Sequence, residues 1–76
     1  MTISTLIIDD EKLARQRLEN LIVEIPELNV LETCSTGKIA IEKINELSPD
    51  LFFLDIKLKD MNGFDILEKI TSSKNL

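Results

Sequence analysis

The chain has 76 residues, of which 43% are hydrophobic and 30% charged, and its formal net charge is −5. A chain of this length forms one small domain at most, with a marginal core, because it buries only about 60–65% of the surface that it exposes when unfolded. The acidic balance disfavours binding of nucleic acid through this segment, since phosphate contacts need a basic face, and it favours a divalent cation.

Cysteine and histidine usage narrows the chemistry. Cys34 is the only cysteine and there is no histidine, so we expect no internal disulfide and no zinc site. We expect Cys34 to be a small apolar residue and not a nucleophile, because no histidine can activate it. Without histidine, the commonest general base, carboxylates are the side chains expected to carry any chemistry. The lack of a signal segment or a long apolar run predicts a cytoplasmic protein with no membrane contact.

The first predicted elements are a strand and a one-sided helix. Thr5–Ile8 is rich in β-branched residues and is followed by three acidic residues. From Lys12 to Ile25 the apolar residues fall at helical spacing; they are Ala14, Leu18, Leu21, Ile22 and Ile25. Asp10 and Glu11 lie at the start of this helix, where the positive end of the helix dipole favours negative charge. Pro26 makes continuation of the helix beyond Ile25 unfavourable.

A second strand and helix follow. Leu28–Thr33 mixes apolar and polar residues, which indicates a short strand near the edge of a sheet. Ser35–Gly37 offers a cap and a turn before a helix from Lys38 to Leu47. Its apolar residues recur three and four positions apart, at Ala40, Ile41, Ile44 and Leu47.

The third strand is the most apolar stretch of the chain. Leu51–Leu54 holds four large apolar residues between turn residues, which predicts a strand buried on both faces, with Phe52 and Phe53 in the core. Asn62 can cap a third helix. We expect this helix to carry its apolar face on Phe64, Leu67 and Ile70, and we expect the polar tail over residues 71–76 to fray.

The order β-α-β-α-β-α predicts the α/β class, with a doubly wound parallel sheet covered by helices on both faces. If the strand order is 2-1-3, then Asp9, Asp10 and Asp55 converge at the carboxyl ends of two neighbouring strands. Strands lie about 4.8 Å apart, so these carboxylates could reach one ion. Three such acids repel one another without a cation, and oxygen ligands suit Mg²⁺.

Two simpler interpretations compete with a metal site. An acid after a strand is a common helix cap, so Asp9 and Asp10 alone give capping or solvation about even odds. Their conjunction with Asp55 favours a metal pocket by about four to one over coincidence. For the charged loop residues Lys57, Lys59 and Asp60, solvation is the default interpretation.

Three segments together resemble the receiver domain of two-component response regulators, and the resemblance covers nearly the whole chain. These segments are Ile7–Glu11, Pro49–Ile56 and Met61–Leu67. The stretch from Glu11 to Leu18 also resembles receivers that are attached to LytTR-type DNA-binding output domains. The resemblance implies a flavodoxin-like fold, of which residues 1–76 would be the N-terminal part of a single receiver domain.

The resemblance also implies roles for individual residues. Asp55 would accept a phosphoryl group from a sensor histidine kinase, without the chain being an enzyme itself. Asp10 and Asp55 would bind Mg²⁺ through their carboxylates, Lys57 through its backbone carbonyl, and Asp9 through a water molecule. The signal would pass to an output domain outside this chain, which we expect to regulate transcription.

Two departures from the family pattern stand out. Many receivers have proline four residues after the acceptor, where this chain has Lys59. A full receiver also continues through two more strands and helices, which supply a Ser/Thr and a Lys to the phosphoryl site. Without them, the edge of the third strand would be exposed, and we expect self-association through it.

Two other functions remain open from the sequence. One is a Mg²⁺-dependent phosphohydrolase with Asp55 as its nucleophile, although haloacid dehalogenase-type enzymes usually have a second aspartate where this chain has Lys57. The other is a receiver-like interaction module that is not phosphorylated.

Overall fold

The computed structural model describes the backbone of residues 2–74 and the side chains of residues 2–70. Three strands alternate with three helices along the chain, as predicted: β1 (Ile3–Ile8), α1 (Lys12–Ile22), β2 (Leu28–Cys34), α2 (Gly37–Leu47), β3 (Leu51–Leu54) and α3 (Gly63–Lys74). Because α3 continues to Lys74, fraying from residue 71 was a wrong expectation for residues 71–74. The expectation for residues 75 and 76 falls outside the described residues.

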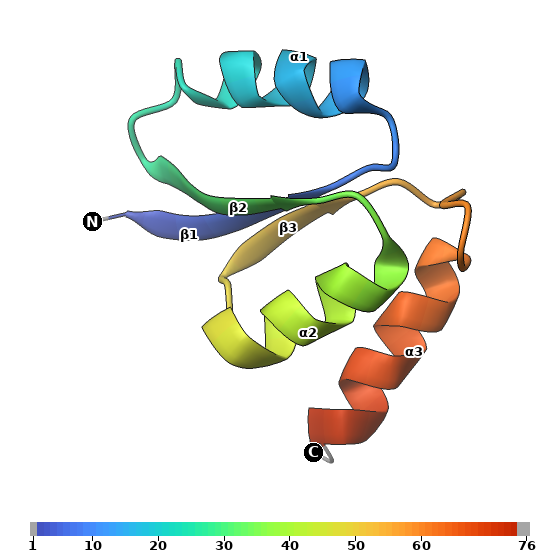
Figure 1. The fold of residues 1–76 in the computed structure, drawn as a ribbon. Helices are drawn as coiled ribbons and strands as arrows, with labels where there is room; N and C mark the ends of the chain where they lie inside the picture. Colours follow the sequence, from blue (N-terminus) through green and yellow to red (C-terminus); the bar gives the residue numbers. More distant parts are fainter. Residues whose placement is uncertain (1, 75–76) are drawn as a thin grey trace.

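The sheet confirms the predicted topology. Its three strands are parallel and lie in the order β2-β1-β3. Figure 1 shows α1 on one face of the sheet and both α2 and α3 on the other, which is the doubly wound arrangement. Strands β1 and β3 stay in register up to the pair Ile8 and Leu54, so both strands end at the same level. The β1–β2 pairing slips by one residue after Thr5.

Strand β1, and not β3, is the buried strand of this sheet. Residues Thr5–Ile8 are fully or almost fully buried between the two helix layers. On the side of α2 and α3 the core is a cluster of apolar residues, namely Leu6, Ile8, Cys34, Ala40, Ile44, Leu58 and Ile66. The central position of β1, with a paired strand on each side, accounts for this burial.

Strand β3 is less buried than the sequence predicted. Leu51 is 37% exposed, and Phe52, Phe53 and Leu54 are half-buried. Phe52 packs against the core cluster at its margin. The exposure of these side chains corrects the expectation of a strand buried on both faces. Within residues 2–74, β3 pairs with β1 alone, which leaves its outer edge open. Self-association through this edge stays a prediction, which light scattering would test.

Helix α1 ends three residues earlier than predicted. Its last residue is Ile22, and Val23 forms the C-cap. The N–H of Val23 donates to the carbonyl of Glu19 at 3.0 Å, and the N–H of Glu24 donates to that of Leu21 at 3.2 Å. The residue before a proline avoids helical geometry, which explains why the chain turns before Pro26. Ile22 is buried, but Leu21 is 67% exposed, so the predicted apolar face is only partly correct.

The starts of α2 and α3 are capped as predicted. Thr36 Oγ1 accepts the N–H of Ile39 at 3.1 Å, and Asn62 Oδ1 accepts the N–H of Phe64 at 2.7 Å. The apolar face of α3 differs from the prediction, because Ile66 is fully buried whereas Phe64 is 63% exposed. Among the described residues, no helix combines the length and the apolar character that crossing a membrane requires.

Candidate functional site

The ends of β1 and β3 place two aspartates side by side. The N–H of Asp55 donates to the carbonyl of Ile8 at 3.0 Å, and the N–H of Asp9 donates to the carbonyl of Cys34 at 3.0 Å. These bonds continue the sheet pairing by one step beyond each strand. Asp9 and Asp55 therefore leave the sheet at the same level on neighbouring strands, which lie about 4.8 Å apart.

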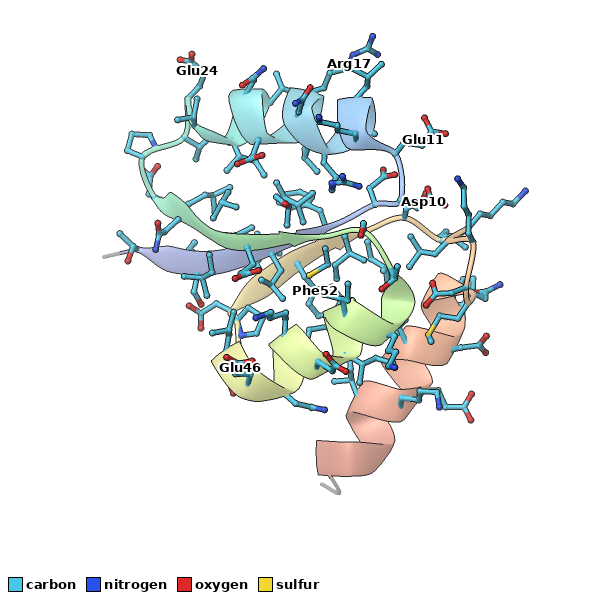
Figure 2. All side chains as sticks on the ribbon, in the orientation of Figure 1. Asp10, Glu11, Arg17, Glu24, Glu46 and Phe52 are labelled. Carbon is cyan, nitrogen blue, oxygen red and sulfur yellow. The ribbon has the colours of Figure 1, made fainter. Side chains whose placement is uncertain are left out.

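Three carboxylates meet at this edge, as the strand order predicted. Asp9, Asp10 and Asp55 are half-buried, and one oxygen of each lies within 4.8 Å of those of the other two. Figure 2 shows Asp10 between the start of α1 and the loop that follows β3. We refer to these three side chains as the acidic cluster.

Each carboxylate of the acidic cluster accepts one backbone N–H. Asp9 Oδ1 accepts the N–H of Glu11 at 3.0 Å. Asp10 Oδ2 accepts that of Lys59 at 3.1 Å, and Asp55 Oδ1 accepts that of Lys57 at 3.1 Å. One oxygen of each carboxylate remains for another ligand.

The acidic cluster fits a hard cation. None of its members forms an ion pair among the side chains of residues 2–70, where the salt bridges are those of Lys43. Three neighbouring negative charges without a counter-charge repel one another. Mg²⁺ prefers oxygen ligands and keeps several waters, so this oxygen-only donor set suits it.

Arg15 is a site residue that the sequence reasoning missed. Its Nη1 donates to the carbonyl of Asp9 at 2.7 Å, which ties α1 to the backbone of the acid pair. A cation one turn into the helix after two aspartates was the available indication. Such a residue is as often solvated, so only the contact identifies its role.

The charged loop after β3 divides into two kinds of residue. Lys57 and Lys59 have exposed side chains, in agreement with the solvation expected for them. Asp60 differs, because its carboxylate accepts the N–H groups of Gly37 at 2.8 Å and Lys38 at 3.1 Å. The bond from Gly37, followed by other backbone bonds, lowers the pKa of Asp60 below its ordinary value of 3.8. Asp60 is exposed, as expected for a solvated residue, but the expectation missed its two hydrogen bonds to the start of α2.

The loop returns tightly to the sheet at Gly63. The N–H of Gly63 donates to the carbonyl of Ile56 at 2.7 Å. A Cβ at Gly63 would lie 3.0 Å from Ile56 Cα and 3.2 Å from the Asp55 carbonyl oxygen. This close approach explains the glycine after Asn62, and it brings the start of α3 against the backbone of Asp55.

Cys34 is the buried apolar residue that the sequence predicted. It lies in the core at the end of β2 as a free thiol. Burial, with a smaller effect from the Glu32 carboxylate, raises the pKa of its thiol above the ordinary value of 9.0. A raised pKa keeps the thiol protonated near neutral pH and disfavours nucleophilic chemistry.

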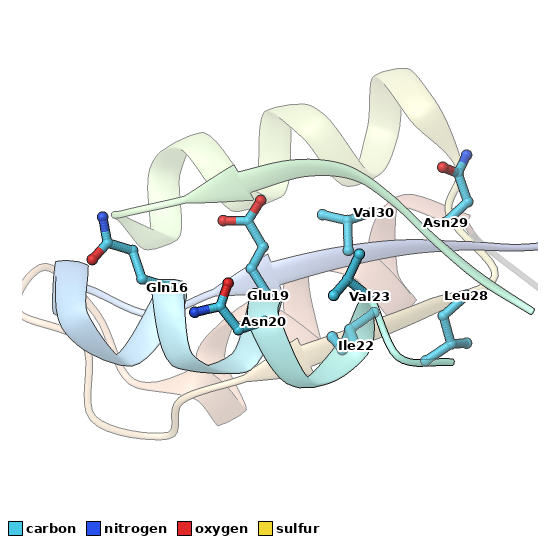
Figure 3. Close-up of a pocket in the computed structure, with 8 residues that line it drawn as sticks. All are labelled: Gln16, Glu19, Asn20, Ile22, Val23, Leu28, Asn29 and Val30. Atoms are coloured by element: carbon cyan, nitrogen blue, oxygen red, sulfur yellow. The ribbon is translucent and has the colours of Figure 1, made fainter. Parts of the chain in front are cut away.

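An open groove of about 650 Å³ lies between α1 and β2, apart from the acidic cluster. Figure 3 shows its lining residues, which come from α1, from its C-cap Val23 and from the first half of β2. They are Gln16, Glu19, Asn20, Ile22, Val23, Leu28, Asn29 and Val30. None of the site residues predicted from the sequence lines this groove.

Comparison with known proteins identifies the family. A family model described as the response regulator receiver domain matches residues 5–76. The sensory transduction protein LytT of Enterococcus faecalis is 42% identical over 69 residues, which cover 91% of this chain and 28% of that protein. A protein-glutamate methylesterase/protein-glutamine glutaminase of Geobacillus kaustophilus is 38% identical over 69 residues, which cover 91% of this chain and 20% of that protein.

A solved structure agrees with both the sequence match and the fold. The response regulator domain of CheB from Thermotoga maritima superposes with a TM-score of 0.89 at 32% identity, covering 95% of this chain and 54% of that one. This chain spans less than a third of the two curated relatives. Receiver domains generally bind Mg²⁺ at an acidic pocket and interact with histidine kinases and output domains. With the receiver model matched over residues 5–76 and the receiver fold present, this chain belongs to the response regulator receiver domain family, which implies a phosphoryl-acceptor role.

Proposed function

We propose that Asp55 accepts a phosphoryl group from a phosphorylated histidine of a sensor kinase in a Mg²⁺-dependent reaction. The observation that supports this proposal most strongly is the acidic cluster, whose oxygens lie within 4.8 Å of one another. We further propose that residues 1–76 are the N-terminal part of a single receiver domain in a cytoplasmic protein. The partial coverage of the CheB receiver supports this assignment.

The residues of the site have different roles in this proposal. Asp10 and Asp55 would bind the cation through carboxylate oxygens, Asp9 through a water, and Lys57 through its backbone carbonyl. When bound, Mg²⁺ would neutralise charge on the phosphoryl oxygens and orient them. An Asp55 oxygen forms the bond to phosphorus while the bond between phosphorus and the kinase imidazole breaks. The N–H of Lys57 holds Asp55 Oδ1 and so restricts rotation of the attacking carboxylate.

The output of the parent protein is also a proposal. The likeness to LytT and the stretch after the acid pair favour a LytTR-type DNA-binding domain that regulates transcription. The methylesterase relative carries a similar segment within a protein of a different named activity. Similar receiver segments therefore occur in proteins with different outputs. Residues 5–76 support the proposal about the phosphoryl site and do not identify the output.

Intact mass spectrometry tests the phosphoryl-acceptor role. The chain is incubated with Mg²⁺ and a small phosphodonor such as acetyl phosphate. A lasting adduct of one phosphoryl group supports the receiver. Release of inorganic phosphate with repeated turnover would support the phosphohydrolase instead. If neither an adduct nor turnover is observed, the result favours an interaction module.

Calorimetry tests the metal site separately. We expect wild type to bind Mg²⁺ weakly, with a Kd on the order of millimolar, because the ion keeps several waters and gains little from each ligand. Asp10→Asn removes one of the proposed carboxylate ligands and should weaken binding at least about tenfold. Equal affinities of wild type and Asp10→Asn would contradict the assignment of the acidic cluster as the metal site.

A further inference from the structure

The loop between β3 and α3 is fastened to the start of α2 by Asp60. One carboxylate oxygen accepts the N–H of Gly37 at 2.8 Å and the other accepts the N–H of Lys38 at 3.1 Å. The first N–H groups of a helix have no partner within the helix, and its N-terminus attracts negative charge. Asp60 therefore satisfies two free donors of α2 and holds the loop against that helix.

Packing of Met61 against Gly37 also holds the loop at the start of α2. Gly37 is buried, and a Cβ at this position would overlap Met61 Cγ and Met61 Sδ. The side chain of Met61 thus occupies space that only a glycine leaves open. Two consecutive loop residues, Asp60 and Met61, are seated on the start of α2 in this way.

The same loop reaches the acidic cluster through the backbone of Lys59. Its N–H donates to Asp10 Oδ2 at 3.1 Å. Because Lys59 directly precedes Asp60, the attachment of Asp60 to α2 also limits where this N–H can point. Proline has no N–H. The residue found at this position in many receivers could not make the bond, so the bond depends on the departure at Lys59.

We propose that Asp60 and the backbone N–H of Lys59 form a positioning device for the metal site, in which Asp60 seats the loop on α2 and the N–H orients the Asp10 carboxylate. This inference rests on the proposed Mg²⁺ site and adds residues that do not touch the ion. The N–H occupies Asp10 Oδ2 and leaves Oδ1 for the cation. Groups that orient metal ligands in this way typically change metal affinity by about 10–100-fold.

A matched pair of substitutions at Lys59 isolates the backbone N–H. Lys59→Ala and Lys59→Pro both remove the side-chain charge, but only the proline variant loses the N–H. In calorimetric titrations of the full chain with Mg²⁺, we expect Lys59→Pro to bind about tenfold more weakly than Lys59→Ala. Asp60→Ala should weaken binding in the same direction without introducing a proline, and Asp60→Asn, which retains one acceptor oxygen, should restore part of the affinity.

Asp50→Ala controls for general loss of stability. Asp50 Oδ2 accepts the N–H and the hydroxyl of Ser4, both at 3.1 Å, at the opposite end of β3. Its substitution removes a comparable pair of bonds far from the acidic cluster, so Mg²⁺ affinity should stay within about twofold of wild type. An NMR measurement adds a readout without metal: the Lys59 amide resonance should shift in Asp10→Asn and in Asp60→Ala.

The outcomes separate the two proposals. Absence of Mg²⁺ binding by wild type would overturn the metal site and this inference together. If wild type binds and Asp10→Asn does not, equal affinities of Lys59→Pro and Lys59→Ala would overturn the inference alone. Equal weakening by Asp50→Ala and Asp60→Ala would also overturn it, because the effect would then be loss of stability. If circular dichroism shows Lys59→Pro to be unfolded, the comparison of Asp60→Ala with Asp50→Ala decides.

Discussion

Aspartates lie at both ends of β3, but the two ends of the strand use them differently. At the amino end, Asp50 Oδ2 accepts two hydrogen bonds from Ser4, and the Asp50 N–H donates to Ser4 Oγ at 2.9 Å. At the carboxyl end, Asp55 accepts one backbone N–H and lies beside two further carboxylates. Three neighbouring carboxylates with one N–H donor each, in contrast to one carboxylate with two donors, distinguish a site that would attract a cation from a local structural anchor.

The largest expected difference between the two ends is chemical. Asp55→Asn should abolish the phosphoryl adduct completely, because an amide has nearly the shape of the carboxylate but is a poor nucleophile. Its melting temperature without Mg²⁺ should not fall, since one of three repelling charges is removed. Asp50→Asn should still form the adduct. Intact mass after treatment with a phosphodonor measures both, and an adduct on Asp55→Asn would move the acceptor elsewhere.

The neighbouring strand β1 also differs in burial between its two ends. Alanine substitutions of the isoleucines at these ends test this difference. Ile8, at the carboxyl end, is 1% exposed, whereas Ile3, at the amino end, is 36% exposed. Ile8→Ala should destabilise the fold by about 2–5 kcal/mol, because it leaves a cavity in the core. Ile3→Ala should cost about 1 kcal/mol or less, since less apolar surface is lost. Urea unfolding measures both, and equal costs would contradict the difference in packing.

The connection between α2 and β3 contains a residue with a strained backbone. Ser48 forms the C-cap of α2 with φ 45° and ψ 58°, in the left-handed region that a side chain disfavours. Ser48→Gly should therefore stabilise the fold by about 1 kcal/mol, as glycine does at helix C-caps. Thermal unfolding measures the change. Ser48→Ala provides the control, because it removes the hydroxyl but retains the Cβ and should give no such gain.

The smallest expected effect is the pH dependence of the attachment at the carboxyl end. Because the folded-state pKa of Asp60 is lowered below 3.8, its hydrogen bonds stabilise the fold fully above that value. Their contribution is lost as the pH falls through the lower folded-state pKa. The exposure of Asp60 to solvent keeps this contribution small.

Urea unfolding between about pH 6 and pH 2.5 checks this expectation. The stability difference between wild type and Asp60→Asn should shrink towards the acid end of that range. Glu42→Gln, on an exposed part of α2, corrects for the change in net charge. A difference that stays constant with pH would show that the Asp60 carboxylate does not contribute through its charge.

Much of the fold follows from local patterns. Helical spacing, turn residues and the acids after two apolar runs are sufficient to place the elements, the caps at Thr36 and Asn62, and the convergence of Asp9, Asp10 and Asp55. These features depend on residues close in the chain, or on the rule that parallel strands share their carboxyl ends. The errors concern burial. Phe53 and Leu51 have the composition of a core strand, but pairing with other elements sets how much of each is covered.

The roles of Arg15 and Asp60 were beyond the reach of the sequence for the same reason. Arg15 contacts the Asp9 carbonyl, and Asp60 contacts the start of α2 from a loop 22 to 23 residues further along the chain. Charged residues in loops and first helical turns are usually solvated, so composition carries no information about such partners. Periodicity reports which face of an element is apolar, whereas the packing of the sheet between its helices sets which groups that element meets. The three aspartates could therefore be named in advance, and the groups that hold them in place could not.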